Sequence, residues 1–288
     1  MPAIRMGLFC LIHNYELFTM NLQEITFQAE TAARAAGDFI LLHINKLKTN
    51  QIEVKGEHNY VTFVDKGAEE IIVKMLQMVV PEATFLTEEE TVKSEVGEWQ
   101  WIIDPLDGTT NFIHGIPLFS VSIALAHHGI PVAGVVYEIN SRECFSAWKG
   151  GHALLNGNPI HVSECDDMNE SLLATGFPYY DYDLLSEYLG LFGSFMKHTR
   201  GLRRFGSAAV DLAWVACGRV DGFYEYGLNP WDVAAGALIV EQAGGQVTDF
   251  KGGNDFLAGK RIVASNSSLH AAYLKTIAQY FPLDNEKC

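Results

Sequence analysis

Two aspartates, Asp104 and Asp107, stand in the part of the chain with the richest chemistry. The surrounding sequence is WIIDPLDGTTNF, in which a short apolar run gives way to oxygen-bearing side chains and turn formers. Two carboxylates so close repel each other unless a cation lies between them, and carboxylate, carbonyl and water oxygens are the ligands that Mg²⁺ prefers. The amides of Gly108 and Thr109 and the hydroxyls of Thr109 and Thr110 suit a phosphate. For the pair of aspartates alone, an acidic β-turn is an equally good interpretation.

The apolar run before these aspartates, from Trp101 to Ile103, has the composition of a buried strand. Because Pro105 has no amide hydrogen for a strand ladder, we expect the strand to end at about Asp104. Gly108 lets the backbone come close to a bound group. The sequence thus predicts a turn at a strand end that presents two carboxylates.

The composition is that of a globular protein with a sizeable core: 288 residues, 48% hydrophobic and 19% charged. The net charge of −15 argues against nucleic acid as the main partner, because a phosphate backbone needs a basic face. The charge is compatible with a small phosphorylated substrate, because bound Mg²⁺ reverses its local sign. No apolar run reaches the roughly 18 residues needed to cross a membrane. Five scattered cysteines without a C-x-x-C pair indicate a reduced, cytoplasmic setting, and they suggest neither zinc nor a disulfide framework.

The elements that position the chemistry follow from hydrophobic periodicity. Apolar residues recur at helical spacing over 21–45 and 65–80, with Asp65 as the expected cap of the second helix. Short strands are expected over 61–64 and 84–87, with a polar, mobile loop over 46–60. Antiparallel strands are then expected over 120–126, 131–137 and 144–148. After residue 170 the pattern alternates, with strands over 172–175, 222–226, 245–248 and 261–264 and helices over 182–197, 207–217, 231–243 and 269–280.

These elements divide the chain near residue 160 into an antiparallel α+β half and an α/β half. We expect residues 1–20 to form an extension outside the fold, with Met20 as an alternative start. The two subdomains would then span 21–160 and 161–288.

Three further acidic residues could belong to the same site, but each also has an ordinary structural interpretation. Glu88 follows a predicted strand and is, taken alone, more typical of a solvated acidic loop. Asp232 follows Trp231 at a predicted helix start, where the helix dipole favours an aspartate. Asp65 is, taken alone, a helix cap.

Together these segments resemble the inositol monophosphatase family, part of the wider group of Mg²⁺-dependent, lithium-sensitive phosphatases. The resemblance covers about residues 21–281 and rests on WIIDPLDGTTNF preceded by Glu88-Glu89 and followed far downstream by NPWDVAAG. It extends to the sequences VTFVD at 61–65, FGSAAVDLA at 205–213, GRVDGFYE at 218–225 and EQAGG at 241–245. The resemblance implies a layered αβαβα sandwich of mixed α+β and α/β character.

The resemblance also implies a set of metal ligands. Glu88, Asp104 and the Leu106 carbonyl would hold a first Mg²⁺, and Asp104, Asp107 and Asp232 a second, with Asp104 bridging the two. Glu88 would also lie near a third, more loosely held ion. The metal and phosphate groups would therefore lie mainly in the first subdomain.

Other roles implied by the resemblance concern phosphate, water and substrate. Gly108 and Thr109 would bind phosphate oxygens, while Thr109 with Asp65 would orient the attacking water, so that Thr109, Asp65 and Glu88 form the catalytic set. The substrate hydroxyls would contact Ser207, Ala208, Glu225 and Asp232, and Lys55 would lie in a loop that folds over the metals. Thr87 replaces a glycine common in the family and Glu90 a frequent serine, which puts the geometry of that loop in doubt.

The resemblance implies a phosphomonoesterase that releases phosphate from myo-inositol 1-phosphate or a similar small polyol phosphate, with Li⁺ inhibition and a homodimer. Histidinol phosphate, fructose 1,6-bisphosphate, 3′-phosphoadenosine 5′-phosphate and NADP remain alternative substrates. The Glu225 carboxylate accepts hydroxyl hydrogen bonds and disfavours a second phosphate nearby. A non-catalytic binding or regulatory protein on the same scaffold is an alternative of a different class.

Several conspicuous residues receive a structural interpretation. His127-His128 is expected to form a hairpin turn, and His114 has no partner at metal-ligand spacing. Cys217 is expected in the core, and Asp211 and Asp221 are expected to be structural. Arg203-Arg204 are expected to pair with other charges at the surface, with substrate contact as the alternative. The tyrosines 179, 180 and 182 are expected in packing or at an interface.

Overall fold

The computed structural model describes residues 20–44, 46, 52–56, 59–93, 96–178 and 182–281, with the backbone alone described at 52–56 and 59–61. Residues 1–19 of the expected extension, the side chain of Lys55, and Tyr179 and Tyr180 lie outside the described residues. Within the described part, none of the helices combines the length and the apolar character needed to cross a bilayer.

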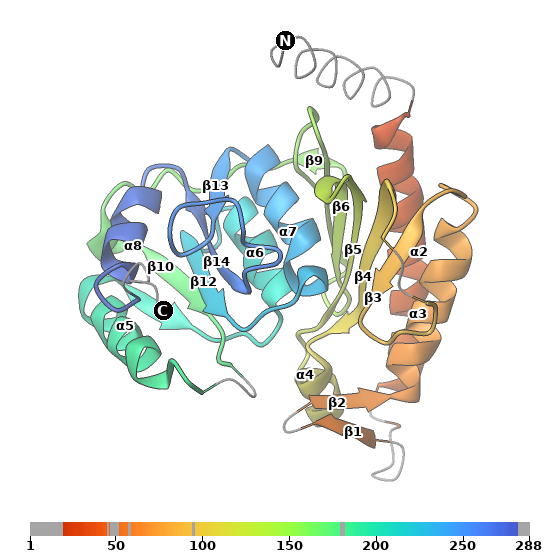
Figure 1. Cartoon of the computed structure of the whole chain (residues 1–288), viewed down its shortest axis with the longest axis horizontal. Helices are drawn as coiled ribbons and strands as arrows, with labels where there is room; N and C mark the ends of the chain where they lie inside the picture. The colour runs from red at the N-terminus through yellow and green to blue at the C-terminus, as the bar shows by residue number, and fades with distance from the viewer. Residues whose placement is uncertain are drawn as a thin grey trace, which may run out of the picture.

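Five layers of helices and sheets make up the molecule (Figure 1). Helices α2 (Leu22–His43) and α3 (Phe63–Leu76) cover one face of a seven-stranded sheet. Helices α6 (Ala208–Ala216) and α7 (Pro230–Gln242) lie between this sheet and a five-stranded one. Helices α5 (Leu185–His198) and α8 (His270–Ile277) cover the outer face of the second sheet. The predicted αβαβα sandwich is confirmed.

The seven-stranded sheet has strands in the order of the chain, β3 to β9. Its strands are β3 (Thr84–Thr87), β4 (Trp99–Asp107), β5 (Ser120–His127), β6 (Ile130–Glu138), β7 (Glu143–Trp148), β8 (Leu154–Leu155) and β9 (Asn158–Pro159). Strands β3 and β4 pair in parallel, and the other described neighbours pair antiparallel. The carboxyl ends of β3 and β4 therefore meet at one edge of the sheet, so that Glu88 lies beside β4 and donates its backbone N–H to the Ile103 carbonyl at 3.2 Å.

The five-stranded sheet has the order β11-β10-β12-β14-β13. Its strands are β10 (Leu172–Thr175), β11 (Gly201–Arg203), β12 (Gly222–Tyr226), β13 (Gly245–Thr248) and β14 (Arg261–Asn266). The first three in spatial order are parallel, and β14 runs antiparallel to β12 and β13. The remaining elements are the strand pair β1 (Ile52–Gly56) and β2 (Asn59–Thr62), helix α4 (Thr109–His114) and the 3₁₀ turn η2 (Met168–Glu170).

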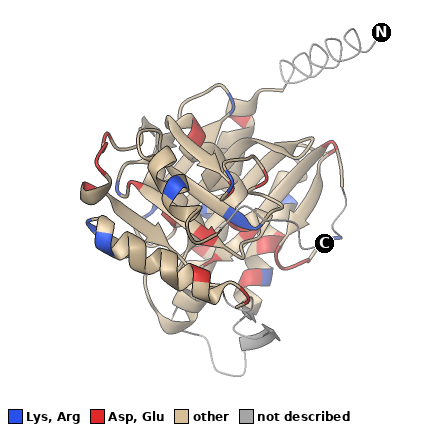
Figure 2. Cartoon of the chain, turned by 60° about the vertical axis from the view of Figure 1, so that its left-hand side comes forward, with Lys and Arg blue, Asp and Glu red and all other residues tan. Residues whose placement is uncertain are grey.

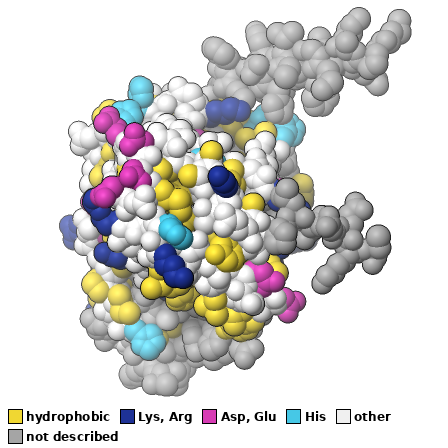
Figure 3. Space-filling model, turned by 90° about the vertical axis from the view of Figure 1, so that its left-hand side faces the viewer, with side chains coloured by type: hydrophobic (Ala, Val, Ile, Leu, Met, Phe, Trp, Pro, Cys, Tyr) yellow, Lys and Arg dark blue, Asp and Glu magenta, His cyan; other side chains and the backbone are white. Residues whose placement is uncertain are grey.

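Three apolar clusters fill the spaces between the layers. One lies between α2, α3 and the first sheet, one between the two sheets around α6 and α7, and one between the second sheet, α5 and α8. Strand β5 is buried at every position because helices cover both faces of its sheet. On the outer face seen in Figure 3, hydrophobic side chains remain exposed among charged ones. The exposed hydrophobic side chains of α5 are Leu185, Leu189 and Met196.

The prediction that the strand ends at Asp104 is wrong, because β4 continues to Asp107. Strand β3 pairs with β4 only as far as Ile103, so no backbone N–H is needed at Pro105 to pair with β3. On the other side, Asp104 faces Ser122 and Asp107 faces Ser120, which leaves two residues of β4 opposite one of β5. This bulge accommodates the proline and turns the two aspartates toward the end of the sheet.

Three further predictions near residue 60 are wrong. The loop expected over 46–60 contains the antiparallel pair β1–β2, and helix α3 begins at Phe63, where a strand was expected. Asp65 is not the residue that caps α3. Thr62 occupies that position and accepts the Val64 N–H at 3.1 Å, while Asp65 accepts the Thr62 N–H at 2.8 Å. This reciprocal arrangement is a capping box, and it leaves the other Asp65 oxygen for a further partner.

Buried His270 should make the stability of the fold depend on pH. Its two ring nitrogens lie 2.9 Å from the Thr248 hydroxyl and 2.8 Å from the Ser265 hydroxyl, and burial lowers its pKa to about 4. In the unfolded chain the imidazole of His270 is protonated near pH 6.5, whereas in the folded protein it stays neutral down to about pH 4. The contribution of neutral His270 to the free energy of unfolding is therefore fully present above pH 6.5 and is lost as the pH falls toward 4. We expect a loss of about 2 kcal/mol between pH 7 and pH 5.

Urea unfolding of the wild type and His270→Gln at both pH values measures this contribution. The glutamine variant should lose clearly less stability than the wild type over the same interval. Equal losses in the two proteins would show that His270 is not the responsible group.

Candidate active site

A pocket opens where the ends of β4 and β12 meet the beginnings of α4, α6 and α7. Its lining is dominated by acidic residues and glycines, and in Figure 2 red Asp and Glu segments are seen on the ribbons near the middle of the molecule. The lining residues are Glu88, Asp104, Leu106, Asp107, Gly108, Thr109, Thr110, Gly176, Arg204, Gly206, Ser207, Ala208, Asp211, Glu225, Gly227, Leu228, Asn229 and Asp232. Every predicted metal ligand, and Gly108, Thr109, Ser207, Ala208 and Glu225, is therefore brought to one place.

Glu88 enters the pocket from the end of β3, and a residue that the sequence did not single out holds its loop. Glu69 of α3 is fully buried and accepts hydrogen bonds from the Thr87 hydroxyl, the Glu89 N–H and both the N–H and the hydroxyl of Thr91, at 2.6–2.9 Å. Its only signal in the sequence was a glutamate on the inward face of a predicted helix. Glu69 therefore fixes the turn on both sides of Glu88.

Asp107 joins the two halves of the chain. Its Oδ2 accepts the Ser207 hydroxyl at 2.6 Å and the Ala209 N–H at 2.8 Å, and both partners belong to the beginning of α6. Ser207 also caps this helix and lies 3.1 Å from the Ser120 hydroxyl. The Ser207 hydroxyl is thus engaged with Asp107 and the fold, although we expected it to contact substrate.

Asp232 enters the pocket from the first turn of α7. The Asn229 N–H donates to its Oδ2 at 2.7 Å, which leaves the other carboxylate oxygen for the pocket. Pro230 begins the helix at the position where a missing N–H is harmless. The segment NPWD therefore both starts a helix and aims an oxygen at the other acids.

Thr109 and Asp65 form the pair that the sequence predicted. The Thr109 hydroxyl lies 3.1 Å from the free Oδ1 of Asp65 and 2.9 Å from the Leu106 carbonyl. Gly108 precedes Thr109 with a φ of +93°, and an added Cβ would lie 3.2 Å from the carbonyls of Gly206 and Leu118. Only glycine fits this crowded, left-handed position, which sets the first amides of α4 at the pocket wall.

The four predicted carboxylate ligands are in electrostatic conflict. Burial raises the pKa of Asp104 well above its usual value, and the charges of Glu88, Asp107 and Asp232 raise it further. Burial likewise raises the pKa of Glu88 and Asp232, with added repulsion from Asp232 on Glu88 and from Asp107 on Asp232. Burial also raises the pKa of Asp107, against which the Ser207 and Ala209 hydrogen bonds act.

The donor set fits Mg²⁺. Four carboxylates converge with the Leu106 carbonyl, every donor is a hard oxygen, and nitrogen and sulfur ligands are missing from the described pocket lining apart from the cationic Arg204. Repulsion among buried acids is the condition that a bound divalent cation relieves. The residues present are therefore suited to hold the metal ions that the sequence predicted.

The other end of the pocket contains groups that sequence reasoning assigned elsewhere. Asp211, expected to be structural, lines the pocket, is 1% exposed, and its Oδ1 has no hydrogen-bond partner among the described residues. Burial, with repulsion from Glu225 and Asp107, raises its pKa well above the usual range. Arg204, expected at the surface, also lines the pocket, and its guanidinium lies 5.5 Å from the Phe177 ring centre.

Glu225 is also buried at this end. Burial raises its pKa to about 8, although the Arg204 charge acts in the opposite direction. A Cβ at Gly176 would lie 2.1–2.2 Å from the Glu225 carboxyl, so this glycine makes room for it. Gly176 has no signal in the sequence that distinguishes it from an ordinary loop glycine.

Other candidates lie away from the pocket. His114 is exposed, and Asp221 accepts the Ser163 hydroxyl and the Leu172 N–H at 2.5 and 2.7 Å, as a structural aspartate does. Arg203 is exposed and donates to the Leu202 carbonyl.

The layered fold and the carboxylate-lined pocket between its sheets define a class of protein, and comparison with known proteins specifies it. The model of the inositol monophosphatase family matches residues 21–281. The Nus factor SuhB of Pseudomonas aeruginosa is 44% identical over 256 residues, which cover 87% of this chain and 94% of that protein. The Nus factor SuhB of Escherichia coli K12 is 42% identical over 247 residues, covering 85% and 92%.

Solved structures agree with the sequence comparison. The extragenic suppressor protein suhB of Bartonella henselae superposes with a TM-score of 0.83 at 39% identity, covering 90% of this chain and 98% of that one. The inositol monophosphatase of Anabaena superposes with a TM-score of 0.80 at 38% identity, covering 90% and 97%. The chain therefore belongs to the inositol monophosphatase family, a family of Mg²⁺-dependent phosphatases.

Mg²⁺ should stabilise the protein, and more so at higher pH. The pKa values of the four carboxyls are higher in the folded protein than in the unfolded chain. In the metal-free protein, their contribution to stability is therefore fully present below about pH 4 and is lost as rising pH ionises them in the folded state. Bound Mg²⁺ reverses this loss. The increase in Tm on adding Mg²⁺ should therefore be larger at pH 8 than at pH 6, as differential scanning calorimetry would measure.

Asp104→Asn should separate stability from metal binding. The variant removes one repelling charge and should raise the free energy of unfolding in EDTA by about 1 kcal/mol, while it loses most of the Mg²⁺-dependent increase. Asp255→Asn, at an exposed position outside the pocket, is the matched control and should behave as the wild type. A destabilised Asp104→Asn variant in EDTA would contradict the repulsion inferred here.

Proposed function

We propose that the protein is a Mg²⁺-dependent phosphomonoesterase that hydrolyses a small polyol phosphate, with myo-inositol 1-phosphate as the best-supported substrate. The charge of the pocket carries this proposal: six of the lining residues described above are carboxylic acids, and one is an arginine. A phosphate dianion would be repelled from such a pocket unless divalent cations were bound there first. Solved relatives named inositol monophosphatase support the assignment.

The residues divide into two functional groups. Glu88, Asp104, Asp107, Asp232 and the Leu106 carbonyl would hold Mg²⁺, with two or three ions per site. When bound, Mg²⁺ supplies the positive charge that lowers the pKa of water and neutralises the phosphate and the leaving oxygen. The amides of Gly108 and Thr109, at the beginning of α4, would hold phosphate oxygens and so orient the phosphorus.

The Thr109–Asp65 pair would place the attacking water. Thr109 lines the pocket, and its hydroxyl is held by the Asp65 carboxylate, which is itself fixed by two hydrogen bonds from Thr62. A hydroxyl oriented in this way accepts a proton from water, and Asp65 is positioned to accept the hydroxyl proton in turn. The chain thus supplies a short proton path that begins at the pocket wall.

The acidic end of the pocket would recognise the alcohol part of the substrate. Protonated Glu225 donates as well as accepts hydrogen bonds, and Asp211 Oδ1, which has no partner among the described residues, is a further acceptor, so a polyhydroxylated group suits both. Arg204 brings one positive charge to this end. Histidinol phosphate, fructose 1,6-bisphosphate, 3′-phosphoadenosine 5′-phosphate and NADP remain alternative substrates of the same chemistry.

A second, non-catalytic role receives support from the relatives named Nus factor SuhB. The net charge of −15 favours a protein partner over direct contact with nucleic acid. Such a role would use the scaffold rather than the pocket. Li⁺ inhibition and a homodimer complete the proposal and rest on the family resemblance, and a cytoplasmic location rests on the scattered cysteines.

Glu88→Gln should abolish catalysis and leave the fold intact. Gln keeps the shape but removes the charge that a metal ligand needs, so kcat on inositol 1-phosphate with Mg²⁺ should fall at least about 100-fold. The matched control is Glu90→Gln, an exposed neighbour outside the pocket, which should keep wild-type activity. Asp107→Asn should also be inactive, but it additionally weakens the contacts to Ser207 and Ala209 and so should lower Tm.

The same Glu88→Gln protein separates the two roles. Near-normal phosphate release by the purified variant would contradict the assignment of Glu88 as a metal ligand in a phosphatase site. If the variant restores growth to the native host deprived of the wild-type chain, the scaffold role is the one that the cell needs.

Substrate preference should depend on Glu225. On a panel of the five candidate phosphates, inositol 1-phosphate should give the highest kcat/KM, and Glu225→Ala should lower it at least about tenfold, or 1.4 kcal/mol. The same variant should change kcat/KM for 4-nitrophenyl phosphate much less, because this substrate has no hydroxyls for Glu225. A preference for histidinol phosphate by more than about tenfold would overturn the substrate assignment.

A further inference from the structure

A second cluster of metal-ligand side chains lies at the opposite end of β4 from the acidic pocket. Glu98 immediately precedes β4, while His127 ends β5 and His128 follows it. None of the three lines the pocket, and the six residue steps from Glu98 to Asp104 along an extended strand span about 20 Å. We propose that this cluster is a separate binding site for one Zn²⁺ ion.

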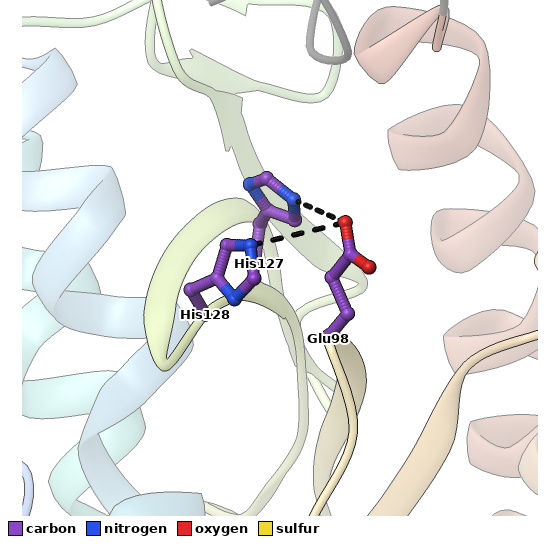
Figure 4. Close-up of side chains that lie close together, drawn as sticks. All are labelled: Glu98, His127 and His128. Carbon is purple, nitrogen blue, oxygen red and sulfur yellow. Dashed lines mark hydrogen bonds and ion pairs between the residues drawn. The ribbon is translucent and has the colours of Figure 1, made fainter. Parts of the chain in front are cut away.

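The geometry of the three side chains matches what Zn²⁺ requires. The His127 Nε2 lies 3.3 Å and the His128 Nε2 3.8 Å from the same Glu98 Oε1, and one ligand atom from each residue lies within 4.8 Å of the others. Two ligands around a tetrahedral zinc at about 2.1 Å are about 3.4 Å apart. In Figure 4 dashed lines join a ring nitrogen of each histidine to the same oxygen of the Glu98 carboxylate.

Backbone structure, rather than side-chain mobility, brings the histidines together. Successive residues of a strand point to opposite faces, yet the ring centroids of His127 and His128 are only 4.4 Å apart. The reason is the two-residue turn between β5 and β6, in which His128 and Gly129 have φ values of +49° and +78°. This is the type I′ pattern, for which Asn-Gly is the common choice and histidine an infrequent one.

Two of the three ligands are also held in place by the fold. His127 is 1% exposed, and its ring stacks on Trp99 at a centroid distance of 4.1 Å. The His128 N–H donates to the Glu98 carbonyl at 2.8 Å, which fixes the turn against the start of β4. Glu98 and His128 are about half exposed, so an ion reaches the site from solvent and keeps a position for water.

The ligand types select the metal. Two imidazole nitrogens and one carboxylate suit Zn²⁺, whereas the all-oxygen pocket suits Mg²⁺. Because the three ligands come from the start of β4 and the β5–β6 turn, bound Zn²⁺ would tie these elements together. The site would therefore stabilise the strand that carries Asp104 and Asp107 without touching substrate.

Zinc binding to the full, untagged chain tests this proposal. In excess Mg²⁺, which occupies the acidic pocket, titration calorimetry with ZnCl₂ and metal analysis after dialysis should show one bound Zn²⁺ per wild-type chain. His128→Asn keeps a side chain that favours this turn, and Glu98→Gln keeps the shape of the glutamate. Both variants should bind this Zn²⁺ at least about tenfold more weakly.

A spectroscopic and a thermal measurement locate the ion. Co²⁺ in place of Zn²⁺ should give visible absorption bands in the wild type that are lost in both variants. At a Zn²⁺ concentration about 100 times Kd, Tm of the wild type should rise by about 5 °C, and Tm of the variants should not. His161→Asn, at an exposed histidine outside the cluster, should behave as the wild type in every assay.

Equal Zn²⁺ stoichiometry and affinity in the wild type, Glu98→Gln and His128→Asn would overturn the proposal. So would a wild-type chain that binds no Zn²⁺ once Mg²⁺ fills the pocket. In either case the cluster is a hydrogen-bonded histidine–glutamate contact that holds the hairpin.

Discussion

Repulsion among buried carboxylates is the physical constraint on which the rest of this structure depends. Glu88, Asp104, Asp107 and Asp232 come from two strand ends and one helix start. Burial raises the pKa of all four acids, and repulsion from neighbouring carboxylates adds to this for Glu88, Asp104 and Asp232. An isolated turn would relieve such repulsion by moving its side chains into water. Here the sheets and helices that carry the acids are packed into the apolar cores on either side, so the acids cannot move apart. A bound cation is then what can offset their repulsion.

The surrounding contacts show how the fold opposes this repulsion. Glu69 accepts four hydrogen bonds from the loop around Glu88, and Asp107 accepts two from the start of α6. These bonds join different elements of the sandwich, so the Glu88 loop and Asp107 are each held by an element other than their own. The consequence is a preorganised site, whose cost in stability is met by the folding of the cores rather than by the substrate.

The sequence predicted most of the metal end of the pocket and little of the substrate end, for a physical reason. Asp104, Asp107 and Thr109 lie in one continuous segment, and Glu88 follows a strand that had to run beside it, so local pattern and spacing were enough. Pro105 led to the wrong prediction that β4 ends at Asp104, because the bulge that accommodates the proline depends on where β3 stops pairing with β4. Asp211, Arg204 and Gly176 were assigned elsewhere or passed over, because their positions at the pocket depend on how α6 and the segments after β11 and β10 pack in space.

The two ends of the pocket use the same chemical group for opposite purposes. At the metal end, several acids share a small space, and a divalent cation is the natural partner of their combined charge. At the substrate end, burial raises the pKa of Glu225 to about 8, so near neutral pH this acid is largely uncharged. An uncharged acid does not compete for Mg²⁺, and it both donates and accepts hydrogen bonds. The proposed separation of metal binding from alcohol recognition therefore needs no change of residue type: four acids grouped in one place suit a cation, and the buried, protonated Glu225 suits a hydroxyl.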